Sequence, residues 1–266
     1  MFLTFLHYFL IGTLAGTMSG LLGIGSGVVV VPALAFVFRF QQFPTQLIMH
    51  MAAGTSLASM VVTTSRALLG HVRRHIQFWS IYRRFMPAVI VGTVSGSVLA
   101  HYLPSFALRI IFGIVLLFFA IKMFLQKSPD TEKHNLPGRF GCWSVGFVIG
   151  GKSGLLGLGG GTFSIPFLTH CSVPMRQALV VSTAIGVTVS VVGAASFMLT
   201  GLYAVGLPAW STGYVYWPAW LGIITGSLCF VPLGVHLSHR LPTVMLRRIF
   251  ATFLLIVGVH MLYVFK

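Results

Sequence analysis

Long apolar runs dominate this chain and limit what it can fold into. Four such runs lie in each half of the 266 residues. Most are longer than the roughly 20 residues that a helix needs to cross the hydrocarbon core of a bilayer. Charged residues make up only 7% of the chain, and the mean hydropathy is +0.95. Because backbone polar groups inside lipid are satisfied only in helices or closed barrels, the sequence predicts an all-α polytopic membrane protein.

The charge of the chain is strongly one-sided. Seventeen Lys and Arg residues face only two acids, Asp130 and Glu132, which gives a formal net charge of +15. The cations flank the apolar runs and do not gather on one soluble face, so membrane topology explains them and nucleic-acid binding is not expected. Three scattered cysteines form no metal spacing, and we expect no metal and no cofactor. The first run lacks the pattern of a signal peptide, so we expect it to be retained as a membrane helix.

An internal duplication organises the chain. Three blocks occur once in each half, in the same order: GLLGIGSG (20–27) and GLLGLGGG (154–161), GTVSGS (92–97) and GIITGS (222–227), LPSFALRIIF (103–112) and LPTVMLRRIF (241–250). A proline, Pro32 or Pro166, follows each glycine motif. Matched blocks in the same order predict two homologous halves.

Each half divides into four apolar segments. They span 2–38, 45–69, 80–102 and 105–125 in the first half, and 141–170, 175–200, 214–236 and 242–265 in the second. The stretch between the halves is polar and holds both acids. We therefore expect a first transmembrane repeat over 1–125, a cytoplasmic linker over 126–140 and a second transmembrane repeat over 141–266.

Lys and Arg are distributed unevenly between equivalent loops of the two halves. Five arginines lie in or beside the loop after the second segment: Arg66, Arg73, Arg74, Arg83 and Arg84. The equivalent loop, 201–217, has neither Lys nor Arg and is rich in aromatic residues. Because basic loops stay in the cytoplasm, the two loops are expected on opposite sides of the membrane and the halves are expected to be inverted. Inversion requires an odd number of crossings in each half, with both chain termini outside the cytoplasm.

The first segment of each half is expected to be a hairpin of two half-helices bent at the glycine motif, beside three simple crossings. As one straight helix, residues 2–38 would run about 55 Å, well beyond a core of about 30 Å. Glycines permit backbone conformations that a helix cannot use, and Pro32 is expected at the start of the return leg. In inverted-repeat transporters such paired segments point helix N-termini at an anion near the midplane. We expect the two tips to meet there.

The second glycine stretch also matches other patterns. Residues 146–153 read GFVIGGKS, which fits the P-loop pattern. A P-loop needs a carboxylate to help hold Mg²⁺, a dinucleotide fingerprint needs an acid further along the chain, and no span contains an acid. Met18 also occupies the position that Lys152 has in the repeat. Nucleotide binding is therefore not expected, and close packing of helices through small residues remains the alternative role for the glycines.

The glycine motifs and the segments that follow them resemble those of a known family. The twin motifs GLLGIGSGVVVVP and GLLGLGGGTFSIP, with AGTSL at 53–57 and STAIG at 182–186, are similar to the TauE/SafE sulfite exporter (TSUP) family over essentially the whole chain. The resemblance implies a multi-pass transporter in a prokaryotic inner membrane. It implies sulfur-containing anions as substrates, such as sulfite, thiosulfate or organosulfonates including sulfoacetate, and no enzyme chemistry.

The residues themselves also favour an anion. No span contains Asp or Glu, so the usual ligands for a cation or a proton relay are missing. Lys152 is expected to be buried about 16 Å into its helix, close to the middle of the core, where a bound anion would compensate its charge. Snorkelling or capping by carbonyls is the alternative. The expected substrate contacts are the tip glycines, nearby hydroxyls and this lysine: Gly23, Gly25, Ser26, Gly27, Thr55, Ser56, Lys152, Gly157, Gly159, Gly160, Gly161, Thr162, Ser182 and Thr183. The hydroxyls have an alternative, which is to bond back to their own helix.

Two features of the sequence allow more than one interpretation. His50, about one turn before Thr55, is a candidate for anion contact or for a coupled proton, with an interfacial histidine as the alternative. The chain is expected either to transport small sulfur-containing anions or to be a non-transporting membrane subunit or scaffold in sulfur metabolism. A cation-lined cavity open to one side would favour transport, whereas two packed, dry hairpins would favour a scaffold. The expected partners are the anion and the lipid bilayer.

Overall fold

The computed structural model describes residues 2–22, 25–72, 78–125, 136–238 and 243–263. These residues form ten helices and one short β-hairpin. The helices are α1 (Phe2–Leu22), α2 (Gly27–Phe40), α3 (Ile48–Val72), α4 (Trp79–Tyr102), α5 (Ser105–Leu125), α6 (Arg139–Leu156), α7 (Gly161–His170), α8 (Met175–Gly201), α9 (Trp217–Ser238) and α10 (Thr243–Tyr263). The strands β1 (Ser211–Thr212) and β2 (Val215–Tyr216) pair antiparallel between α8 and α9. The all-α prediction is confirmed, and the hairpin is an addition that the sequence did not predict.

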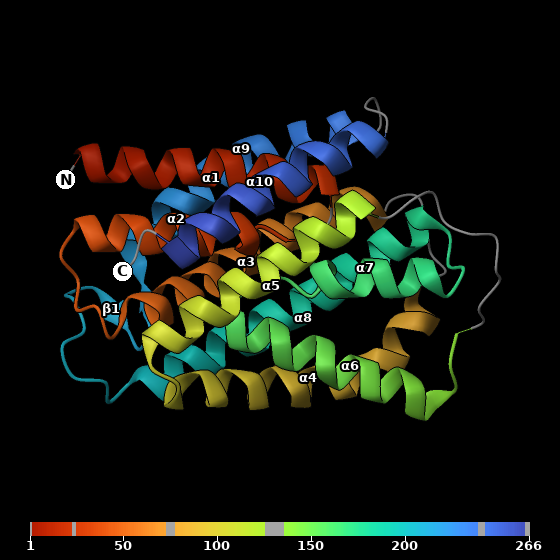
Figure 1. The fold of residues 1–266 in the computed structure, drawn as a ribbon, viewed down its shortest axis with the longest axis horizontal. Helices are drawn as coiled ribbons and strands as arrows, with labels where there is room; N and C mark the ends of the chain where they lie inside the picture. The colour runs from red at the N-terminus through yellow and green to blue at the C-terminus, as the bar shows by residue number, and fades with distance from the viewer. Residues whose placement is uncertain (1, 23–24, 73–77, 126–135, 239–242, 264–266) are drawn as a thin grey trace.

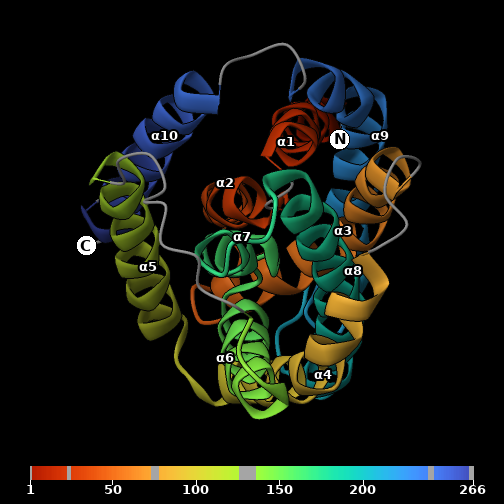
Figure 2. The same ribbon diagram turned by 90° about the vertical axis from the view of Figure 1, so that its right-hand side faces the viewer.

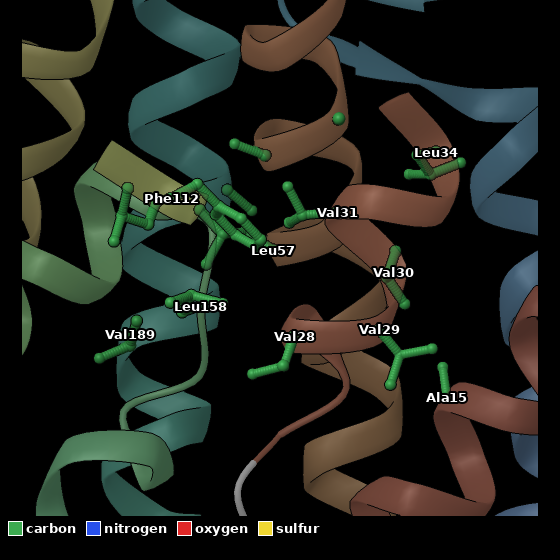
Figure 3. Packing of buried hydrophobic residues seen from close by; sticks show 14 of the residues in the cluster. Ala15, Val28, Val29, Val30, Val31, Leu34, Leu57, Phe112, Leu158 and Val189 are labelled. Atoms are coloured by element: carbon green, nitrogen blue, oxygen red, sulfur yellow. The ribbon is translucent and has the colours of Figure 1, made fainter. Parts of the chain in front are cut away.

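Pairs of long helices surround two short ones. α1 packs on α9, α4 on α6, α3 on α8 and α5 on α10. Figure 2 looks along the bundle and shows α2 and α7 in its middle. The start of α2 is apolar on every side, with Val28, Val29, Val30 and Val31 all buried. Figure 3 shows these valines pointing toward different neighbours, as expected for a helix enclosed by others.

Glycines at four-residue spacing let two of the outer pairs approach closely. α1 presents Gly12, Gly16 and Gly20 to α9, and α6 presents Gly146, Gly150 and Gly154 to α4. A Cβ atom on Gly16 would lie 2.7 Å from the Cα atom of Ser227, which leaves no room for a larger residue. This is the small-residue packing of membrane helices, and it accounts for these six glycines.

The first predicted segment of each half is a hairpin, as expected, with legs of unequal length. α1 and α6 have 21 and 18 residues, and their return legs α2 and α7 have 14 and 10. At 1.5 Å per residue α1 is about 30 Å long, so the prediction of a half-helix is wrong for this leg. Pro32 and Pro166 lie inside α2 and α7 and not at their starts, which corrects a second expectation. Packed membrane helices tolerate an internal proline when their neighbours satisfy the freed carbonyl group.

Three described helices are long and apolar enough to cross a membrane by length and composition. They are Trp79–Tyr102, Gln177–Gly201 and Trp217–Leu237. Shorter apolar helices cover Gly27–Phe40, Ser105–Ile121 and Ala251–Tyr263. With the helical content and the apolar composition, these segments make the chain an integral membrane protein.

Equivalent turns lie at opposite ends of the bundle. In Figure 1 the end of α3 and the start of α4 lie at the right, whereas the start of α1, the end of α10 and strand β1 lie at the left. Arg83 and Arg84 are exposed near the start of α4. α6 begins at Arg139, two residues inside the expected linker 126–140, whose residues 126–135 lie outside the described part of the chain.

Candidate functional site

The tips of the two hairpins touch each other in the middle of the bundle. A Cβ atom on Gly25 would lie 3.0 Å from the Cα atom of Gly159, and one on Gly27 would overlap the carbonyl oxygen of Gly157. Gly25 and Gly157 have φ angles of +91° and +68°, a region that residues with a side chain rarely occupy. The expectation that the tips meet is therefore confirmed. Gly23 lies outside the described residues.

Two helices, α3 and α8, hold the tips from the sides. A Cβ atom on Gly157 would lie 2.6 Å from the Cα atom of Ala53 in α3, and one on Gly160 would lie 2.7 Å from Ile185 in α8. Met60 of α3 fills the space beside Gly25. Figure 3 shows Leu57 of α3 beside Leu158 of the second tip, with Val28 and Val189 nearby. The segments AGTSL and STAIG thus lie against the glycine motifs, although about 130 residues separate AGTSL from the STAIG segment.

Both return helices begin at this contact. α2 starts at Gly27 and α7 at Gly161, and Figure 1 shows them running from the centre of the bundle toward opposite ends. The start of a helix carries a partial positive charge, and its earliest N–H groups have no acceptor within the helix. From Val29 in α2 and Thr162 in α7 onward, the N–H groups already donate to carbonyl oxygens of the tips, so only the N–H groups before these residues are left for a ligand. Two such ends face one region of a core that contains no acidic residue, because Asp130 and Glu132 both belong to the linker. This arrangement favours an anion.

The hydroxyl pair from the first half is buried beside the second tip. Ser56 donates from Oγ to the carbonyl oxygen of Gly157 at 3.2 Å. Thr55 accepts on Oγ1 a hydrogen bond of 3.0 Å from the backbone N–H of Tyr216. Neither side chain is exposed. Ser56 therefore supports the bend of the opposite hairpin, while Thr55 anchors the β-hairpin.

The pair from the second half is buried as well. Ser182 and Ser164 of α7 are hydrogen-bonded through their hydroxyl oxygens. Thr183 donates to the carbonyl oxygen of Leu179 in its own helix at 2.7 Å, so for this residue the back-bonding alternative is correct. Ser26, at the first tip, lies 3.2 Å from the hydroxyl of Thr63 in α3. Each of these side chains is already partnered.

Five other hydroxyls are buried without a hydrogen-bond partner in the described structure. Ser211 lies in strand β1, and the other four lie in the helices: Ser19, Thr64, Ser153 and Thr162. Burying an unsatisfied hydroxyl is costly, so such groups call for a ligand or water. Thr162 is the second residue of α7, and a Cβ atom on Gly186 would lie 3.1 Å from the methyl group of Thr64. Sequence reasoning named only Thr162. Ser19 and Ser153 occupy matching positions just before the two glycine motifs, and that match could have identified them.

Lys152 is not buried, which corrects the expectation from its position in the sequence. Its side chain is exposed on α6, and its Nζ lies 5.7 Å from the centre of the Phe163 ring. The helix explains the difference, because Ser153 and Gly154, the next two residues, take the faces that turn inward. The whole P-loop-like stretch 146–153 lies inside α6 and so cannot form a phosphate-binding loop.

His50 is buried at the start of α3. Its Nε2 lies 3.0 Å from the carbonyl oxygen of Ala100 and 3.1 Å from that of Leu103, so it donates to the end of α4. Its ring lies 5.1 Å from that of Tyr214, whose hydroxyl is 3.0 Å from Nδ1 of His101. Burial raises the pKa of Tyr214, which therefore keeps its proton. The observed contacts of His50 are structural, and its contact with an anion stays a prediction.

Among the described residues, no group of three or more His, Cys, Asp or Glu side chains is placed to hold a metal ion. The remaining polar chemistry at the tips consists of hydroxyls and backbone N–H groups. These are hydrogen-bond donors that can replace the water around an oxyanion without adding a negative charge.

A bundle of apolar helices with two glycine-bent hairpins meeting at its centre is the architecture of an integral membrane protein. The sequence profile described as "Sulfite exporter TauE/SafE" matches residues 8–261. The chain belongs to this family, and the family is one of transporters and not of enzymes.

Relatives extend over almost the whole chain. A "probable membrane transporter protein" of Haemophilus influenzae is 33% identical over 98% of this chain and 99% of its own length. A protein with the same description from Methanocaldococcus jannaschii is 26% identical over 95% and 93%. YunE of Bacillus subtilis, described in the same way, is 22% identical over 98% of each chain. No solved structure matches the chain.

Proposed function

We propose that this protein is a secondary transporter of small sulfur-containing anions, such as sulfite, thiosulfate or organosulfonates, in a prokaryotic inner membrane. One observation carries the proposal. The starts of α2 and α7 meet at the touching tips, in a core without a carboxylate. Helix N-termini bind oxyanions through free N–H groups and the helix dipole. The family description, sulfite exporter, supports sulfur oxyanions as the substrate class.

The proposed architecture is two inverted halves, 1–125 and 141–266, joined by a cytoplasmic linker. The packing supports it. α1 and α6 are equivalent in the repeat, and so are α4 and α9. α1 packs on α9, and α6 packs on α4. Gly25 and Gly159 are themselves repeat partners, and they touch. Two equivalent residues can touch only near the axis that relates the halves. The opposite directions of α2 and α7 in Figure 1 agree with this axis.

The touching tips suggest how transport would proceed. In the present arrangement Gly27 packs against Gly157 and Met60 covers Gly25, so the space between the tips is closed. Packed tips alone would fit the scaffold alternative, and the transporter family is what favours transport. An anion would be held there by the N–H groups of α2 and α7, with Thr162, Thr64, Ser19 and Ser153 as the unpartnered hydroxyls within this core. Alternating access would then require the two hairpins to part on one side at a time.

Flux in proteoliposomes tests this function. Purified protein should accumulate radiolabelled sulfite, thiosulfate or taurine faster than empty vesicles, with a saturable rate. Imposed pH and sodium gradients would identify the coupling ion. A folded protein that moves none of these three compounds would instead support a non-transporting subunit of sulfur metabolism.

Cysteine labelling tests the inverted architecture. In a variant without Cys142, Cys171 and Cys229, single cysteines replace Ser80 at the start of α4 and Tyr203 after α8, both exposed. A membrane-impermeant thiol reagent should reach Tyr203→Cys from outside the cell and Ser80→Cys only after the membrane is opened. Labelling of both from one side would rule out inverted halves.

A further inference from the structure

A pocket of about 590 Å³ lies between α5, α6 and α7, beside the second hairpin. Its walls are apolar, with Phe118 and Phe119 from α5 and Phe163 and Phe167 from α7. The volume is within the range of about 300 to 1,000 Å³ that small-molecule sites occupy. Two polar side chains line the pocket, Lys152 and His170.

The pocket leads along the second hairpin. Phe163 lies in the first turn of α7, next to the tip, and His170 is the last residue of that helix. Figure 1 shows α7 running from the centre of the bundle toward the end where α6 begins. The pocket residues therefore extend from that end of the molecule to the tip, with Lys152 beside the first turn of α7.

Among the described residues, the charge in this pocket has no acidic counterpart, because Asp130 and Glu132 both lie outside them. Every span of the chain lacks Asp and Glu, and the described contact of Lys152 is with the face of the Phe163 ring. A cation–π contact leaves the ammonium N–H groups able to donate to an anion. Apolar walls around one cation strengthen its attraction for an anion, because water screens the charge less there.

The first hairpin has no cation at the matching position, and its Arg39 lies in the last turn of α2, away from the tip. Met18 occupies the position that matches Lys152, and Phe36 occupies the position that matches His170. The Phe36 ring packs instead against Phe40 and His260. Of the two hairpins, only the second therefore carries a lysine beside the first turn of its return helix.

We propose that the pocket between α5, α6 and α7 is a capture site, in which Lys152 binds a small sulfonate or sulfite anion that enters from the end where α6 begins. The capture site holds the anion before the tips do. This inference rests on the proposed transport function and adds a direction to it. The apparent affinity is higher on the face where α6 begins than on the opposite face, because only that route contains a lysine.

The test compares half-saturation concentrations on the two faces, using right-side-out and inside-out vesicles. Labelling of Ser80→Cys and Tyr203→Cys fixes which face is which. Methanesulfonate and sulfite are the probes. Lys152→Met should raise the half-saturation concentration about tenfold on the face where α6 begins, and clearly less on the other. An equal change on both faces, or none on either, overturns the proposal.

Two matched variants sharpen the result. Lys152→Arg keeps the charge and should retain most of the difference between faces. Met18→Lys combined with Lys152→Met places the cation on the first hairpin, and the higher affinity should move to the opposite face. Failure of the difference to move, in a protein that still transports, contradicts the capture site.

Two further measurements distinguish the capture site from a lipid site and from the transport function itself. An anionic lipid headgroup shares the chemistry of the probes, so the assay is repeated in vesicles of zwitterionic lipid alone. Loss of the Lys152 effect there would mean that the pocket binds lipid and would overturn the proposal.

Thr162→Val, at the tips, should weaken transport from both faces. If Thr162→Val has its effect but Lys152→Met does not, only the capture site fails; if the wild type shows no saturable flux, the transport function itself fails.

Discussion

In the first hairpin the helix after the tip begins with four buried valines, Val28 to Val31, whereas in the second it begins with Thr162, Phe163 and Ser164. The bends before these helices are similar but not identical, because Gly25 matches Gly159 in the repeat and Gly157 matches Gly23. Each uses a glycine in the left-handed region, Gly25 or Gly157, and each touches the other tip. The two hairpins therefore share a glycine bend, and they differ in the lengths of their legs and in the polar groups that follow the bend.

This difference separates what the fold requires from what binding requires. The bends, the small-residue packing of α1 and α6 and the central position of α2 and α7 recur in both halves. The polar groups Lys152, Thr162, Ser164 and His170 occur only in the second, opposite Met18, Val28, Val30 and Phe36. The shared features are those on which folding depends, and the unshared ones are candidates for substrate contact.

The largest expected effect comes from changing a tip glycine. Gly157→Ala should lower the free energy of unfolding by at least about 1 to 2 kcal/mol, because alanine is strained at this φ angle and its Cβ would press on the backbone of Ala53. Gly25→Ala should cost less, since its nearest obstacle is the flexible end of Met60. Unfolding in a denaturing detergent, followed by circular dichroism, measures the difference.

Gly70→Ala is the matched control for these glycines. A Cβ atom on Gly70 would lie 3.8 Å from the nearest atom, a methyl group of Val235. Alanine is favoured over glycine inside a helix by about 0.5 to 1 kcal/mol, so Gly70→Ala should leave stability unchanged or raise it. Equal losses in Gly157→Ala and Gly70→Ala would show that the bend does not depend on glycine.

The next effect concerns the hydroxyl that the first hairpin lacks. Thr162→Val removes an unpartnered buried hydroxyl and keeps the shape of the side chain. If that hydroxyl donates to the anion, the half-saturation concentration for flux should rise about tenfold. Thr183→Val is the control, because the hydroxyl of Thr183 already donates a hydrogen bond to the carbonyl oxygen of Leu179. This variant should raise the half-saturation concentration clearly less. Similar kinetics for wild type and Thr162→Val would remove this residue from the site.

The smallest expected effect compares the two matched serines. Ser19→Ala and Ser153→Ala should each weaken anion affinity about twofold to threefold, and by similar amounts if the halves contribute alike. A serine without any ligand would behave differently. Removing its buried, unsatisfied hydroxyl would stabilise the protein and leave the affinity unchanged. Thermal unfolding and flux measured on the same preparations distinguish the two results.

Much of the fold could be predicted because the duplication is visible in the sequence. The positions of both hairpins could be predicted from the glycine motifs. The contrast in Lys and Arg content predicted that equivalent loops lie at opposite ends of the bundle. The lengths of α1 and α6 could not be predicted, since nothing in an apolar run marks how deep its bend lies. The β-hairpin at 211–216 was missed because its strands have only two residues each.

The candidate site was predicted less completely, and for a physical reason. The distance along the sequence gave the position of Lys152 along the axis of α6. It could not give the face of the helix on which the side chain lies, and so its burial was predicted wrongly. Hydroxyls that bond their own helix, such as Thr183, look the same in the sequence as those left unpartnered, such as Thr64. Only the contacts between α3, α8 and the tips show which hydroxyls are partnered and which are not.

The central claim, that an anion binds where the two tips meet, is tested most directly by protection of a cysteine at that point. Thr162→Cys is introduced in the variant without native cysteines, and its reaction with a small water-soluble thiol reagent is timed. Methanesulfonate, well above its half-saturation concentration, should slow the reaction severalfold, because the bound anion occupies the start of α7. Tyr203→Cys, which is exposed and far along the chain from the tips, should react at the same rate with and without the anion. An unchanged rate at Thr162→Cys, or no reaction there in a protein that transports, would contradict binding at the tips.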